Sequence, residues 1–286
     1  MRADTPFSFY SPPAMPFDLL LIVELAALGL TSGFLAGLLG IGGGMVMVPF
    51  MTVILSKQGV NPELSIKMAI ATSMATIVFT SVSSVRAHHK RGAVRWDLVK
   101  KLAPGIILGA AMASLGAFLW LKGAMLALIF AFFVSFSASQ MLLDKKPAAS
   151  RQLPGTAGLM GVGSCIGFVS GLVGAGGGFM SVPFMTWCNI AIHNAVATSA
   201  ALGFPIALAN ATGFAMGGLD VVNLPDYALG YIWLPGLAVI ALCSVTTAPL
   251  GAKAAHQLPV KQLKRVFASV LYLLAAYMLF KGIQSW

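Results

Sequence analysis

The chain has 286 residues, of which 58% are hydrophobic and only 9% are charged, and its mean hydropathy is +0.88. A soluble globular domain does not carry this much apolar surface, so the composition excludes that class. The net charge of +10 could indicate a nucleic-acid partner, but the Lys and Arg residues stand in short loops between apolar segments and form no basic stripe, which excludes that function as well.

Ten apolar segments follow one another along the chain. They cover residues 18–40, 44–56, 65–85, 99–121, 123–143, 156–175, 178–190, 193–215, 229–252 and 265–283. Most of them approach the roughly 20 residues that a helix needs to cross a hydrocarbon layer about 30 Å thick. The sequence therefore predicts an all-α integral membrane protein with about ten transmembrane segments, whose first partner is the lipid bilayer.

A long motif occurs twice. GFLAGLLGIGGGMVMVPFMT at residues 33–52 returns as GFVSGLVGAGGGFMSVPFMT at residues 167–186, with thirteen of twenty positions identical. An Ala-Thr-Ser triplet follows each copy, at residues 71–73 and 197–199. Because the matches keep their order, the chain is interpreted as two copies of one unit.

The two units are residues 1–150 and 151–286, each with five apolar segments, and together they are expected to form one transport domain. An odd number of crossings per unit gives the copies opposite orientations in the membrane. With ten crossings and both termini outside, 13 of the 18 basic residues face the cytoplasm, as the positive-inside rule requires. These are Arg86, Lys90, Arg91, Arg95, Lys100, Lys101, Lys145, Lys146, Arg151, Lys253, Lys261, Lys264 and Arg265. The alternative, eight crossings with both termini inside, places 11 basic residues inside and stays open.

Both glycine-rich motifs open a short segment, residues 45–55 and 179–190. A helix of this length spans only about 16 to 20 Å, too little to cross fully, so its glycine-rich start is expected inside the bilayer. Two such starts in inverted repeats would meet near the midplane, where free N–H groups could bind an anion. The candidate substrate-binding glycines are Gly42, Gly43, Gly44, Gly176, Gly177 and Gly178.

Other glycines in the motifs are better explained by packing. Gly33 with Gly37 and Gly167 with Gly171 have the spacing of close helix contacts, so they are left out of the candidate site. Three consecutive glycines cost about 1 kcal/mol each in a helix, which packing alone explains poorly, so the triplets keep a functional interpretation. A dinucleotide-binding loop is excluded because no strand precedes the glycines.

Two hydroxyl side chains lie about two turns into the third segment of each unit. They are Thr72 and Ser73 in the first unit and Thr198 and Ser199 in the second. They could donate hydrogen bonds to a bound oxyanion, or they could bond carbonyl groups of their own helix, and both interpretations stay open. Two ionisable residues, Glu24 and His193, are candidates for coupling transport to an ion. Lys67 aligns with His193, and its side chain is expected to extend to the membrane surface.

The paired GxxxGxxGxGGGxxxVPxM motifs, each followed by Ala-Thr-Ser, resemble the TauE/SafE sulfite exporter family over nearly the whole chain. The resemblance implies a multi-pass protein of the bacterial inner membrane that exports a small anion, such as sulfite or a sulfonate, by alternating access coupled to an ion gradient. The resemblance implies that the substrate-binding residues are the glycine triplets and the four hydroxyls, with Pro49 and Pro183 as structural hinges. It implies no cofactor. It does not identify the anion, the coupling ion or the direction of transport, although export is the direction expected.

The sequence favours transport over enzymatic function. An enzyme would need a nucleophile with a base or a cluster of metal ligands, and the sequence has no HExxH, no CxxC and no paired intramembrane carboxylates, so no catalytic or metal-binding residue is expected. A passive anion channel or an accessory membrane subunit stays open, because a pore and a carrier can use the same donors. The oligomeric state also stays open, with a homodimer among the alternatives.

Overall fold

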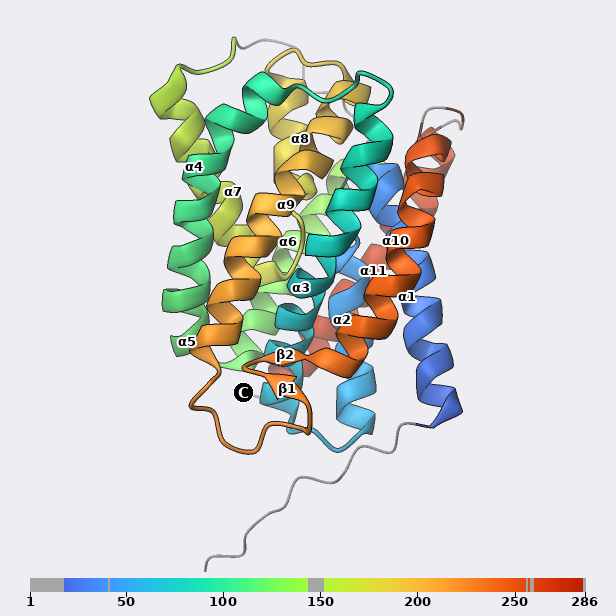
Figure 1. Cartoon of the computed structure of the whole chain (residues 1–286), viewed down its shortest axis with the longest axis vertical. Helices are drawn as coiled ribbons and strands as arrows, with labels where there is room; N and C mark the ends of the chain where they lie inside the picture. Colours follow the sequence, from blue (N-terminus) through green and yellow to red (C-terminus); the bar gives the residue numbers. More distant parts are fainter. Residues whose placement is uncertain (1–17, 41, 144–151, 256, 258–259, 285–286) are drawn as a thin grey trace, which may run out of the picture.

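The protein is a helical bundle in a computed structural model that describes residues 18–40, 42–143, 152–255, 257 and 260–284 (Figure 1). The helices are α1 (Leu19–Leu39), α2 (Gly44–Lys57), α3 (Pro62–His89), α4 (Trp96–Met112), α6 (Gly123–Leu143), α7 (Thr156–Val173), α8 (Gly178–Trp187), α9 (Ile192–Gly217), α10 (Leu234–Ala254) and α11 (Val260–Gln284). A π-helical turn at Ala113–Ala117 and the short helix α5 (Phe118–Trp120) continue α4. Each of the ten predicted apolar segments is therefore confirmed as a helix.

Eight helices in the described part of the chain are long and apolar enough to cross a membrane. The other two, α2 and α8, have only 14 and 10 residues. The apolar faces of these helices need a hydrocarbon environment, so the prediction of an all-α membrane protein is confirmed. The count of ten crossings and the inverted orientation of the repeats stay predictions.

The two ends of the bundle carry different loops (Figure 1). α1 begins and α11 ends at the lower end, which also holds the α9–α10 connection with the two-residue strands β1 (Ala228–Leu229) and β2 (Ile232–Trp233), paired antiparallel. The basic α3–α4 loop lies at the upper end. This relative placement agrees with the arrangement expected from the charge count. Lys145, Lys146 and Arg151 of that count lie outside the described residues, as do the side chains of Lys261 and Lys264.

Helices from the two sequence halves are interleaved. α1 packs along α10, and α4 packs along α7, so each contact joins one unit to the other. Glycines permit these close approaches: a Cβ atom at Gly33 would lie 2.5 Å from Ser244 Cα, and one at Gly167 would lie 3.0 Å from the backbone nitrogen of Ala110. The contacts confirm the packing role predicted for the glycines at spacing four, namely Gly33, Gly37, Gly167 and Gly171.

The centre of the bundle is formed by α3 and α9. Their most apolar stretches are 72% and 56% buried inside the protein, against 33–44% for the six other long helices. The two central helices pack on each other, and each also carries one Ala-Thr-Ser triplet. The fold therefore places the triplets in the interior, next to the glycine-rich turns.

Candidate functional site

Each glycine-rich motif forms a tight reversal between a long helix and a short one. α1 ends at Leu39 with Gly40 as its C-cap, and α2 starts at Gly44 with Gly43 as its N-cap. Both cap glycines have a positive φ, +67° and +72°. The second motif repeats this geometry at Gly174 and Gly177, with φ of +73° and +77°. Only glycine adopts this conformation at little cost, so consecutive glycines allow the chain to turn back within a few residues.

The two reversals contact each other inside the protein. A Cβ atom at Gly42 would lie 2.9 Å from Gly176 Cα, and one at Gly44 would collide with the carbonyl oxygen of Gly174. In Figure 1, α2 extends from this contact toward the lower end and α8 toward the upper end. The structure thus brings the predicted glycines of both repeats together, and it also gives them a steric role that is independent of any ligand.

The N-termini of α2 and α8 are not capped by side chains. Gly43 and Gly177 occupy the N-cap positions, and neither can offer a side-chain acceptor. The first N–H groups of a helix have no acceptor within it and carry partial positive charge. Both short helices therefore direct hydrogen-bond donors toward the central contact, as an anion site requires.

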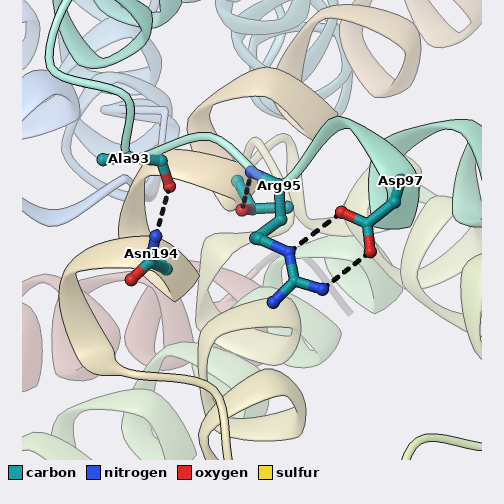
Figure 2. Close-up of polar contacts among 5 residues, drawn as sticks. Ala93, Arg95, Asp97 and Asn194 are labelled. Atoms are coloured by element: carbon teal, nitrogen blue, oxygen red, sulfur yellow. Dashed lines mark hydrogen bonds and ion pairs between the residues drawn. The ribbon is translucent and has the colours of Figure 1, made fainter.

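The two threonines of the triplets bond to the start of a helix in the other half. The backbone N–H of Trp233, at the N-cap of α10, donates to Thr72 Oγ1 over 3.0 Å. The backbone N–H of Arg95, at the N-cap of α4, donates to Thr198 Oγ1 over the same distance. Figure 2 shows the loop around Arg95, where Asn194 also donates to the carbonyl of Ala93 over 2.9 Å. Each threonine therefore fixes one inter-half connection.

The two serines bond to the glycine reversals. Ser73 Oγ donates to the carbonyl of Gly174 over 3.0 Å, and Ser199 Oγ donates to the carbonyl of Gly40 over 2.8 Å. Ser199 also accepts from Ser181 Oγ over 2.9 Å. All four triplet hydroxyls thus make contacts between the halves, in place of the bonds to their own helices that were one of the two open interpretations. Their contact with an anion stays a prediction.

A small central cavity adjoins the glycine reversals, with a volume of about 10 Å³. This is the scale of a single water molecule. Its lining includes three predicted site residues together with residues of α1, α3 and α9: Ala36, Gly40, Gly42, Thr80, Ser81, Ser84, Gly176, Ser199, Ala200 and Gly203. None of these residues is charged, so a ligand here would be held by neutral groups.

Among the buried polar atoms with no hydrogen-bond partner in the described part of the chain are Ser84 Oγ on α3, Ser170 Oγ on α7 and Asn210 Oδ1 on α9. Ser84 lines the cavity, and Ser170 Oγ would lie 3.1 Å from a Cβ atom at Gly177. Buried polar groups are normally paired, so unpaired ones next to a cavity indicate a place for a ligand or water. Sequence reasoning missed Ser84, although it and Asn210 stand eleven residues after Ser73 and Ser199, at equivalent positions of the repeat.

Comparison with known proteins identifies the family. The chain matches the family described as "Sulfite exporter TauE/SafE" over residues 25–278. It belongs to this family. A "probable membrane transporter protein" of Haemophilus influenzae is 38% identical over 256 residues, which cover 88% of this chain and 96% of the relative. Proteins described in the same way from Methanocaldococcus jannaschii and Bacillus subtilis are 27% and 26% identical, over 93% and 92% of this chain and 98% and 99% of theirs. No solved structure matches.

This TauE/SafE family member is thus a multi-pass membrane transporter. Its two candidate coupling residues do not line the central cavity. Glu24 forms an ion pair of 3.3 Å with Lys57, which ties the start of α1 to the end of α2. Sixteen residues of helix, about 24 Å, separate Glu24 from Gly40. His193 is exposed at the start of α9. A role of either residue in coupling stays a prediction. Pro49 and Pro183 lie inside α2 and α8, and their role as hinges stays a prediction.

Lys67 of this TauE/SafE family member is packed inside the protein, contrary to the expectation that its side chain reaches the membrane surface. It is 9% exposed, and its ammonium group donates to the carbonyl of Leu119 over 3.5 Å. The rings of Phe118 and Tyr231 lie 5.9 and 5.8 Å from the nitrogen, within cation–π range. Burial, and then the charge of Glu63, raise the pKa of the Tyr231 phenol. These neighbours hold Lys67 in place.

Proposed function

We propose that this protein is a secondary transporter of the inner membrane that exports a small sulfur-containing or organic anion, such as sulfite or a sulfonate. Membership of a family described as sulfite exporters supports the class of substrate. The relatives are described as membrane transporters, which supports transport in place of a structural role.

The observation that carries the proposal is the meeting of two uncapped helix N-termini beside a cavity with an unpaired hydroxyl. Each N-terminus contributes about half a positive charge and several free N–H donors. An oxyanion needs such donors to replace its water shell, because an uncompensated charge inside the membrane is very costly. Since no Lys or Arg lines the cavity, the anion could also leave again, as turnover requires.

The size of the cavity supports a carrier that changes shape. A space of about 10 Å³ accommodates one water molecule, whereas sulfite has four heavy atoms. The helices around the cavity must therefore separate before an anion can bind. One place is the contact of α3 with α9, where a Cβ atom at Gly203 would lie 3.5 Å from Ser81 Cβ. We propose ten crossings in two inverted repeats, residues 1–150 and 151–286, so that separation at either end opens the same site to a different side.

Flux measurements on the purified chain in liposomes test this function. We expect saturable uptake of sulfite or a sulfonate that responds to an imposed proton or sodium gradient. Fast conductance without saturation would replace the carrier by a channel. An absence of flux from well-folded, oriented protein would favour an accessory subunit that needs a partner chain.

A further inference from the structure

A second and much larger cavity lies away from the glycine reversals, between α3, α9 and α10, with a volume of about 850 Å³. In Figure 1 these helices stand next to one another, with α3 between the other two. We call this cavity the basic groove. It is lined by Val78, Phe79, Val82, Ser83, Arg86, Ala87, Lys90, Arg91, Phe204, Val245, Pro249, Leu250 and Lys253.

The upper part of the basic groove is strongly cationic. Four basic side chains line it at the ends of α3 and α10, and no acidic residue occurs among the described residues of its wall. Neither of the two ion pairs found in the described part of the chain involves these cations. Arg91 donates to the carbonyl of Ala252 over 2.6 Å, which joins the two helix ends and leaves its other N–H donors available. The upper part of the groove, which we call its rim, therefore favours the binding of an anion.

The lower part of the basic groove is apolar. Val78, Val82 and Phe204 lie below the cations, and Phe79 and Leu250 are 51% and 58% exposed on membrane-spanning helices. The one hydroxyl in this wall, Ser83 Oγ, already donates to the carbonyl of Val245 over 2.7 Å. Twelve residues of α3 separate Val78 from Lys90, so the groove follows the helix for about 18 Å, more than half of the hydrocarbon thickness.

We infer that the basic groove binds an anionic phospholipid, with the phosphate among the cations of the rim and an acyl chain along the apolar wall. A small hydrophilic anion would gain from the rim and nothing from the wall, whereas an amphipathic anion uses both. Basic pockets between membrane helices bind anionic headgroups in this way, and Lys and Arg collect on the cytoplasmic side, where anionic lipids attract them. The inference does not depend on which solute is transported.

Native mass spectrometry of the full chain in detergent tests the inference. Phosphatidylglycerol and phosphatidylcholine with the same acyl chains are titrated separately, and inorganic phosphate is added as a competitor. We compare Lys90→Gln/Lys253→Gln in the groove with Lys100→Gln/Lys101→Gln, which removes the same charge from exposed positions of α4 outside it. We expect the parental protein and the α4 variant to retain phosphatidylglycerol in preference to phosphatidylcholine, and the groove variant to bind it at least about tenfold more weakly.

A third variant, Val82→Trp, fills the apolar wall without changing charge. We expect it to weaken the binding of long-chain phosphatidylglycerol and not that of a dihexanoyl analogue. The inference is overturned if the two lipids bind equally, if both lysine pairs matter equally, if millimolar phosphate displaces the lipid completely, or if Val82→Trp leaves long-chain binding unchanged. Circular dichroism of each variant shows that it is folded before its lipid binding is compared.

Discussion

The hydroxyl of Ser199, in the second half of the chain, donates a hydrogen bond to the carbonyl of Gly40 in the first half, 2.8 Å away. The equivalent pair of the repeat, Ser73 and Gly174, makes the same contact in the opposite direction over 3.0 Å. Each half therefore fixes the glycine reversal of the other. The central contact depends on both halves being folded together.

We expect Ser199→Ala to lower the free energy of unfolding, because the buried carbonyl of Gly40 loses its donor and Ser181 loses its acceptor. Hydrogen bonds inside membrane proteins are worth about 0.6 kcal/mol on average, and a carbonyl left unsatisfied adds to the loss, so the effect should be roughly 1–2 kcal/mol. Thermal unfolding in detergent measures it. Ser269→Ala is the control, since that hydroxyl bonds to the carbonyl of Arg265 in its own helix. Equal shifts for the two variants would contradict a special role of the contact between the halves.

Gly203→Ala should reduce transport while the protein stays folded. The added Cβ would meet Ser81 Cβ at 3.5 Å, an ordinary contact, and would occupy part of the central cavity. Alanine also favours a helix by up to about 1 kcal/mol relative to glycine. The matched control is Gly161→Ala in α7, where a Cβ meets nothing within 4 Å. Liposome flux and unfolding temperature, measured on both variants, separate the effect on transport from the effect on stability. Unchanged flux in Gly203→Ala would place the transported anion elsewhere.

Gly44→Ala should destabilise the fold and, as a consequence, also reduce transport. Its Cβ would collide with the Gly174 carbonyl, and relief requires backbone movement of the kind that costs about 1–3 kcal/mol. The measurement is the yield of monodisperse protein in detergent, again beside Gly161→Ala. A normal yield with normal stability would mean that the two reversals are not held in contact.

Ser84→Ala separates binding from folding in a different way. The Ser84 hydroxyl is buried and has no hydrogen-bond partner among the described residues, so its removal should leave stability unchanged or slightly increased. If it donates to the transported anion, the KM for that anion should rise by about tenfold, the worth of one hydrogen bond to a charged group. Thr76→Ala is the comparison, because that buried hydroxyl bonds to the carbonyl of Thr72 and does not line the cavity. An unchanged KM in Ser84→Ala would remove this residue from the site.

The orientation of the bundle can be tested with single cysteines in a chain whose three native cysteines are replaced by alanine. We expect a cysteine at Lys90 to be protected from an impermeant thiol reagent in intact cells, and one at Asp220 to react. Both positions are exposed; Lys90 follows α3 and Asp220 belongs to the α9–α10 connection, and these two loops lie at opposite ends of the bundle (Figure 1). The charge count assigns the Lys90 end to the cytoplasm. Reaction of both cysteines from outside would refute the inverted arrangement. Reaction at position 90 with protection at position 220 would mean that the Lys90 end faces the outside of the cell.

Much of the fold follows from the sequence. All ten helices lie where the apolar segments predict them, because the bilayer imposes a length and a composition that are visible without any tertiary information. The duplication of the motif is visible as identity, and it directed attention to the glycine triplets, which the structure places in contact. The packing glycines were predicted from their spacing alone.

Only the tertiary structure decided what the polar side chains do. The sequence shows Thr72 and Ser73 side by side, but their partners, Trp233 and Gly174, are 161 and 101 residues away. Ser84 resembles any small helix residue until the packing of α3 against α9 leaves its hydroxyl beside the cavity, with no hydrogen-bond partner in the described part of the chain. Hydrogen bonds and cavities depend on which helices become neighbours. That choice comes from shape complementarity over whole helix faces, whereas helix position depends on local hydrophobicity, which can be read from the sequence alone.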